Sequence, residues 1–255
     1  MFVLAVKHEG GRIGEITINR AEKMNAMTLQ MRKDIGKALL AFEQDPEVGA
    51  IVVRGAGGKS FSAGGDVGEF LRITPSDLLD WGEDISSTER MTKPVVAQLE
   101  GYTFGAGLEL ALSCDIRIAS PDVQMALPEA KLGMIPASGG ITRAVKMLGL
   151  SRASYMLLLG KRLDSKTALE WGLVHEVVER ELIQQRVRDI ATELANLSPL
   201  VTKTLKSVLR KISDSPFDSG LDIERKTFGT LRYSADFREG VESFLAKRKA
   251  NFVGE

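Results

Sequence analysis

The chain has 255 residues, close to the length at which one hydrophobic core stops growing, so we expect a single domain with at most a helical appendage. Hydrophobic residues make up 44% and charged residues 27%, a balance typical of globular proteins that excludes disordered and collagen-like chains. The 34 Lys and Arg residues equal the 34 Asp and Glu residues, so no net charge attracts nucleic acid or a membrane surface.

The N-terminal part of the chain predicts a hairpin followed by a helix. Residues 3–6 and 13–18 are expected to form two strands joined by a glycine turn at 10–11. Thr28 is a suitable N-cap, and the Asp-Pro pair at 45–46 is expected to end the helix that it starts. Between these limits, apolar residues recur at helical spacing: Met31, Ile35, Leu39 and Phe42.

Three more strands are indicated, by short apolar runs at 50–53 and 94–99 and by an alternating pattern at 116–119. Glycine-rich turns and helical patterns separate them, and this alternation predicts an α/β protein. After about residue 138 the pattern becomes almost wholly helical. An apolar stripe within 183–194 is expected to pack against the core or another subunit, and Ser-Pro at 198–199 is expected to start a further helix.

Histidine is scarce, which limits the chemistry. We expect His8 and His175 to lie at the surface or at strand ends and not in a catalytic triad. No second histidine or cysteine stands at metal-ligand spacing, so no metal site is expected. Acid–base chemistry would then depend on carboxylates, lysine or tyrosine.

The sequence also carries an expectation about location. No apolar run approaches the ~18 residues that a membrane helix needs. The first residues lack the basic segment of a secretory signal, and Cys114 is the single cysteine, so no intrachain disulfide can form. We therefore expect a cytoplasmic protein that binds neither membrane nor nucleic acid.

Glycine-rich segments stand at 61–66, 101–109 and 127–140, and the second has a clear physical interpretation. Glycines allow a tight turn there, and the residues after Gly107 favour a helix, so Ala106 lies at or near a helix N-terminus. Unpaired N–H groups and the positive end of the helix dipole suit a developing oxyanion. Glu109 falls in the first turn, where an acid that offsets the dipole is common.

Taken together, these segments resemble the enoyl-CoA hydratase/isomerase family, the crotonase superfamily. The similarity begins at 19–26, passes through all three segments, includes 114–116 and ends at 243–252. It implies a spiral of β-β-α units over residues 1–195 and a C-terminal helical region at 196–255 that packs trimers, often paired as hexamers. It also implies an acyl-CoA thioester as substrate and no separate cofactor, because coenzyme A is part of the substrate.

The resemblance assigns roles to particular residues. It implies that Gly65 and Ala106 donate their N–H groups to the thioester oxygen, although the family usually has glycine at the position of Ala106. It makes Glu109 and Glu129 the two catalytic glutamates; which is base and which acid stays open in the sequence, and we take Glu109 as the base that activates water and Glu129 as the donor of a proton to Cα. Contacts to substrate or coenzyme A are expected from six further residues, the last two on a neighbouring subunit: Lys23, Ala26, Ala63, Asp66, Phe244 and Lys247.

Alternative functions remain open at this level. The presence of both glutamates favours a 2-enoyl-CoA hydratase, since isomerases of the family typically keep only the acid at the Glu129 position. A 3-enoyl to 2-enoyl isomerase, or a hydratase of dienoyl or aromatic acyl-CoA, would use the same oxyanion hole. A non-catalytic homologue that binds acyl-CoA or RNA is a third class. Three apolar residues are candidates for the acyl-tail pocket, although helical core packing also explains them: Leu79, Trp81 and Met91.

Overall fold

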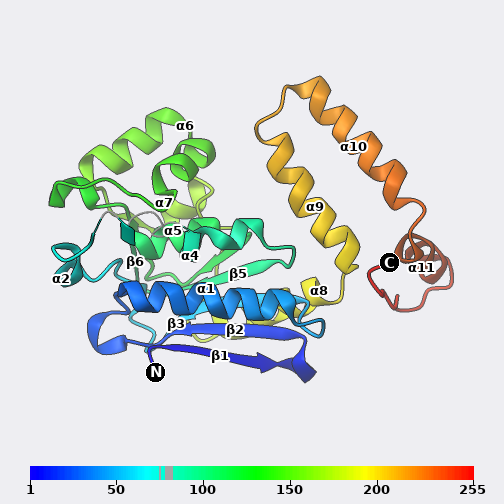
Figure 1. Cartoon of the computed structure of the whole chain (residues 1–255), viewed down its shortest axis with the longest axis horizontal. Helices are drawn as coiled ribbons and strands as arrows, with labels where there is room; N and C mark the ends of the chain where they lie inside the picture. The colour runs from blue at the N-terminus through cyan, green and yellow to red at the C-terminus, as the bar shows by residue number, and fades with distance from the viewer. Residues whose placement is uncertain (75, 78–82) are drawn as a thin grey trace.

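The computed structural model describes residues 1–74, 76–77 and 83–255 and shows an α/β fold (Figure 1). Its larger sheet has the strand order β1-β2-β3-β5-β7-β10 within the described residues. Only β1 runs antiparallel to its neighbour, while the other neighbours pair in parallel. The strands are β1 (Val3–His8), β2 (Ile13–Ile18), β3 (Ala50–Gly55), β5 (Val95–Leu99), β7 (Ile116–Ala119) and β10 (Glu176–Val177).

The smaller sheet has the order β4-β6-β8-β9, again within the described part of the chain. Its first three strands are parallel, and the last is antiparallel to β8. They are β4 (Ser60–Ser62), β6 (Tyr102–Phe104), β8 (Gln124–Ala126) and β9 (Leu163–Asp164).

The two sheets are connected by a repeated unit. Strands β3, β5 and β7 of the larger sheet lead directly into β4, β6 and β8 of the smaller sheet. Each pair is followed by a helical segment, namely α2 (Val67–Phe70), α5 (Ala106–Ser113) or the 3-10 turn η4 (Glu129–Leu132). The expected spiral of β-β-α units is therefore confirmed.

Helix α1 (Leu29–Gln44) follows its sequence signals closely. The Thr28 hydroxyl accepts a hydrogen bond from the N–H of Met31, and Asp45 ends the helix. Its buried face includes the expected apolar stripe and one charged residue, Arg32. Burying such a stripe is the main source of stability for an amphipathic helix.

Apolar side chains form cores on both faces of the larger sheet. Helix α8 (Ile183–Ala195) covers one face, where its residues Ile183, Val187 and Ile190 join Val52 and Val96 of the sheet. The 183–194 stripe is therefore core packing. The other face packs against α1 and α5, and Met91 belongs to this second core.

The C-terminal half is less purely helical than its pattern predicts, because the short strands β9 and β10 lie within it. Two-residue strands are too short to show an alternating pattern, so only their pairing partners reveal them. Within the described residues, the other helical elements before residue 183 are η1 (Glu9–Gly11), η2 (Ala21–Lys23), α4 (Glu83–Ser86), η3 (Ser87–Arg90), α6 (Gly140–Leu159) and α7 (Ser165–Glu170).

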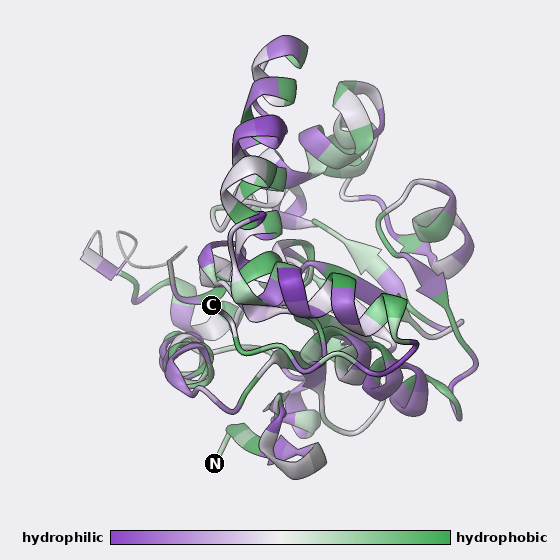
Figure 2. Cartoon of the chain, turned by 90° about the vertical axis from the view of Figure 1, so that its right-hand side faces the viewer, coloured by the Kyte–Doolittle hydropathy of each residue, from purple (hydrophilic) through white to green (hydrophobic). Residues whose placement is uncertain are grey.

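Three helices follow the core and project from it in Figure 1: α9 (Pro199–Ile212), α10 (Phe217–Leu231) and α11 (Ala235–Leu245). Ser198 caps α9 through its hydroxyl, as expected. Large apolar side chains on these helices remain exposed, and hydrophobic bands are visible on them in Figure 2. They include Leu205, Leu209, Phe217, Phe228 and Phe244. The division between residues 195 and 196 stays a prediction.

The histidines lie at or beside strand ends, as expected. His8 ends β1, and His175 directly precedes β10, where its Nδ1 accepts the N–H of Arg117 at 3.1 Å. Cys114 is a buried free thiol. Among the described residues, no helix is long and apolar enough to span a membrane, and no cluster of metal-binding side chains occurs.

Candidate active site

A cavity of about 320 Å³ lies between the β4–α2 loop, the start of α5 and the segment that follows β8. Most of its lining is apolar, including Val67, Phe70, Ile73, Leu132, Met134 and Ile135. Among the described residues, the ionisable side chains in the lining are Arg32, Glu109 and Glu129. An apolar pocket with a few convergent polar groups is typical of a small-molecule site.

The start of α5 forms one wall. Gly105 precedes the helix with φ of 49°, in the left-handed region that glycine adopts at little cost. A Cβ atom there would lie 2.9 Å from Oε1 of Glu129, so glycine also makes room for that carboxyl group. Ala106 is the first helical residue and lines the cavity, and its N–H has no intrahelical acceptor.

Gly65 forms the facing wall, in the loop after β4. The loop is fixed on both sides of it, because Met27 donates to the carbonyl of Gly64 and accepts from the N–H of Asp66. The N–H of Gly65 itself has no partner among the backbone groups of the described residues. As far as the described residues show, Gly65 and Ala106 thus bring two unpaired N–H groups to one cavity.

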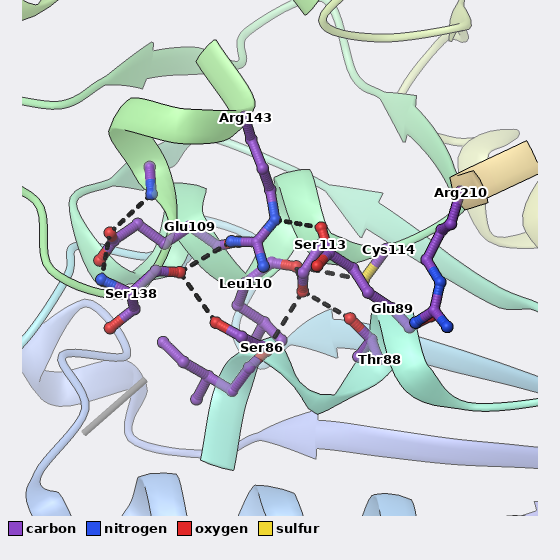
Figure 3. Close-up of polar contacts among 12 residues, drawn as sticks. Ser86, Thr88, Glu89, Glu109, Leu110, Ser113, Cys114, Ser138, Arg143 and Arg210 are labelled. Atoms are coloured by element: carbon purple, nitrogen blue, oxygen red, sulfur yellow. Dashed lines mark hydrogen bonds and ion pairs between the residues drawn. The ribbon is translucent and has the colours of Figure 1, made fainter. Parts of the chain in front are cut away.

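Glu109 is held by the N-terminus of α6. Its side chain is buried, and its Oε1 accepts the N–H of Ser138 at 2.7 Å and the N–H of Gly140 at 2.9 Å. Figure 3 shows the carboxyl group of Glu109 directed at these donors. Two donors on one oxygen fix the orientation of the group.

Glu129 has a contrasting environment. Its Oε2 is buried and has no hydrogen-bond partner in the described part of the chain. Burial raises the pKa of Glu129 to about 7, and the charge of Glu109 adds to this. The backbone N–H of Glu129 itself and the positive charge of Arg32 lower this pKa. Near neutral pH this carboxyl group therefore carries a proton for much of the time.

Arg32 is a site residue that motif reasoning missed. It projects from α1 and is only 2% exposed. Burial lowers the pKa of its guanidinium to about 10, while the charges of Glu109, Asp84, Glu69 and Glu129 oppose that change. A signal existed in the sequence, because Arg32 stands three and seven residues before two members of the apolar stripe.

Arg143 supports the Glu109 donors from outside the cavity. Its Nη1 donates to the carbonyl of Ser138 at 2.7 Å, and its Nε is paired with Glu89 (Figure 3). Arg210 of α9 donates to the backbone carbonyl of Glu89 at 2.6 Å. A continuous set of polar contacts therefore joins the C-terminal helices to the segment that holds Glu109.

The structure brings together five of the ten residues expected at the site, since Ala63, Gly65, Ala106, Glu109 and Glu129 all line the cavity. The other five lie outside its lining. Lys23 and Ala26 stand in and after η2, while Asp66 caps α2 and pairs with Arg20 at 2.7 Å.

Phe244 and Lys247 stand at the end of α11, away from the cavity of the same chain. The structure assigns neither of them to a site within one chain. Two of the tail-pocket candidates, Leu79 and Trp81, lie outside the described residues.

Comparisons with known proteins find relatives over nearly the whole chain. The family model of enoyl-CoA hydratase/isomerase matches residues 8–255. The carnitinyl-CoA dehydratase of Citrobacter koseri is 36% identical over 252 residues, which cover 96% of each chain. An enoyl-CoA hydratase from Bacillus anthracis superposes with a TM-score of 0.93 at 26% identity and full coverage of both chains. DspI from Pseudomonas aeruginosa gives 0.92 at 32% identity, over 99% of this chain and 97% of that one.

Proposed function

The chain belongs to the enoyl-CoA hydratase/isomerase family, and we propose that it adds water reversibly across the 2,3 double bond of a 2-enoyl-CoA thioester, giving a 3-hydroxyacyl-CoA. One observation carries the proposal: two carboxyl groups in contrasting environments face one cavity, beside two unpaired N–H groups. The enzyme would thus be a hydro-lyase.

The two N–H groups bind the thioester oxygen. As the oxygen of water bonds to Cβ, electrons of the double bond move onto the thioester oxygen, which becomes enolate-like. The N–H groups of Gly65 and Ala106 are fixed by the loop after β4 and by the start of α5, so they need no reorganisation. Removing one such donor from an enzyme typically costs about 2.7–4 kcal/mol of transition-state stabilisation.

The environments of the glutamates divide the proton transfers between them. Glu109, held by two N–H donors, takes a proton from water as the oxygen bonds to Cβ. Glu129, whose pKa is raised to about 7, gives its proton to Cα as the enolate collapses. Water is consumed, the negative charge passes from Glu109 to Glu129, and solvent restores the initial protonation after release of product.

Dehydration of a carnitinyl-CoA-like substrate is a second candidate. The 36% identity with a carnitinyl-CoA dehydratase favours it, and the chemistry is the same reaction run toward the alkene. Isomerisation of 3-enoyl-CoA, hydration of dienoyl or aromatic acyl-CoA, and non-catalytic binding of acyl-CoA or RNA are less favoured. Both glutamates lie at the cavity, which favours a hydration or a dehydration over isomerisation and over non-catalytic binding.

The assembly and location are part of the proposal. The exposed apolar side chains of α9, α10 and α11 suit a homotrimer or a hexamer made of two trimers. In such an assembly Phe244 and Lys247 would reach the coenzyme A of a neighbouring subunit, and Lys23, Ala26 and Asp66 would contact coenzyme A from within the chain. We propose a cytoplasmic enzyme with no metal and no cofactor apart from its substrate.

The test follows the enone absorbance of crotonyl-CoA after the enzyme is added. Wild type is expected to remove the absorbance, while Glu109→Gln and Glu129→Gln are expected to be slower by at least ~100-fold. Lys146→Met is a matched surface control, because this lysine forms an exposed ion pair with Asp214, and it is expected to match wild type. Equal rates in wild type and both glutamine variants would refute the assignment.

A further inference from the structure

The two proton transfers give no role to Arg32, the buried cation of the site. Arg32 lines the cavity although α1 buries this face among apolar side chains. Burying a guanidinium is costly unless the charge is compensated. The guanidinium of Arg32 lies beside Gly65, one of the two N–H donors of the site, and this place points to a role in the reaction.

The contacts of Arg32 span the two halves of the site. Its Nη1 donates to Oγ of Ser138 at 3.4 Å, and the backbone N–H of the same serine donates to Glu109. Its Nη2 lies 3.2 Å from the point where a Cβ on Gly65 would stand, so the guanidinium packs against the loop that carries Gly65. We propose that Arg32 is a positioning residue that joins the Gly65 loop to the donors of Glu109 and holds a fixed positive charge beside both glutamates.

The charges around Arg32 support the second part of this role. Among the described residues, carboxyl groups act on it from four elements: Glu69 of α2, Asp84 of α4, Glu109 of α5 and Glu129 of η4. During hydration the negative charge leaves Glu109, passes through the thioester oxygen and arrives on Glu129. A fixed cation that acts on both glutamates and touches the Gly65 loop attracts that charge at each stage.

The inference rests on the proposed hydration, and three variants test it with crotonyl-CoA. Arg32→Met keeps the stem and removes the charge, Arg32→Lys keeps the charge and removes the planar fork, and Lys33→Met is the control on the same helix. We expect Arg32→Met to lower kcat by about 10- to 100-fold with KM changed less than about threefold. Arg32→Lys should recover part of kcat, and Lys33→Met should match wild type.

The pH profile separates this role from simple packing. The cation lowers the pKa of Glu129, so its removal should raise that pKa and move the alkaline limb of kcat to higher pH. Arg32→Lys should keep the limb near its wild-type position. If Arg32 had only a structural role, both variants would have a lower melting temperature, and the alkaline limb of kcat would stay in place.

Wild-type kcat and an unmoved limb in a folded Arg32→Met would overturn the inference while leaving hydration intact. Absence of hydration by wild type would instead refute the proposed function. If Arg32→Met does not fold, Ser138→Ala carries the test, because it removes the hydroxyl that Arg32 contacts and keeps the N–H for Glu109. Lower kcat at unchanged KM supports the positioning role, and wild-type kcat contradicts it.

Discussion

Replacing Glu129 by glutamine should reduce activity and increase stability at alkaline pH. The substitution keeps the size of the side chain and removes its ionisation. Turnover should fall by at least ~100-fold, because the proton donor to Cα is lost. The stability change follows from the raised pKa of a carboxyl group whose Oε2 has no partner in the described structure.

The sign and size of the stability change can be worked out. The pKa of Glu129 is about 7 in the folded chain against 4.5 ordinarily, so the folded state holds the proton more tightly. Wild type therefore loses stability as pH rises from about 4.5 to about 7, and stays lower above that range. One pKa unit corresponds to about 1.4 kcal/mol, and screening of a partly exposed group reduces the total to roughly 1–2 kcal/mol.

Urea unfolding of wild type and Glu129→Gln at pH 5 and pH 8 measures this difference. The variant should gain roughly 1–2 kcal/mol relative to wild type on going from pH 5 to pH 8. The same preparations are assayed with crotonyl-CoA at pH 7. A stability difference that is independent of pH, together with near-normal turnover, would refute both the buried acid and its catalytic role.

Further predictions concern the backbone donors, the pH dependence and the thiol. Gly105→Ala should lower kcat by at least ~10-fold, because the new Cβ would stand 2.9 Å from Oε1 of Glu129 at a positive φ; unchanged kcat in steady-state assays would contradict this. Ala106→Pro removes an N–H at the first helical position, where proline is tolerated, so kcat should fall by ~100-fold or more while circular dichroism stays unchanged. Hydration by wild type should decline above about pH 7 as Glu129 loses its proton, and a rate that rises through this range would oppose the assignment. Burial raises the pKa of Cys114 to about 12, so the native protein should not react with a thiol reagent at pH 8 until urea unfolds it.

Local signals predict much of the fold. Thr28 and Asp45 mark the ends of α1 because capping and proline effects depend on a few adjacent residues. Strand β3 is evident because a buried parallel strand is a continuous apolar run. Strands β9 and β10 are missed because a two-residue strand is defined by its partner, which is distant in the sequence.

The two glutamates are 20 residues apart, and long-range pairing brings them together. Phe104 of β6 pairs with Ala126 of β8, and Gly105 donates to the carbonyl of Ala126. The segments that carry Glu109 and Glu129 therefore leave the smaller sheet side by side. The family resemblance predicts this pair, whereas composition and spacing do not.

The environment of Arg32 cannot be predicted from local sequence patterns. Its helical spacing places it on the buried face of α1, which the sequence reveals. The sequence does not reveal that carboxyl groups from four other elements converge on that point. The same holds for Glu109, because the sequence does not reveal that the N–H groups of Ser138 and Gly140 bind its buried carboxyl group.

The central claim is that this site adds water to the double bond, and isotope incorporation tests it most directly. Crotonyl-CoA is incubated with the enzyme in ¹⁸O-labelled D₂O, and the acyl product is analysed by mass spectrometry. Hydration predicts one ¹⁸O at C3 and one deuterium at C2, with both labels lost in Glu109→Gln at equal reaction time. Deuterium without ¹⁸O would indicate enolate formation and isomerisation, and would contradict the account.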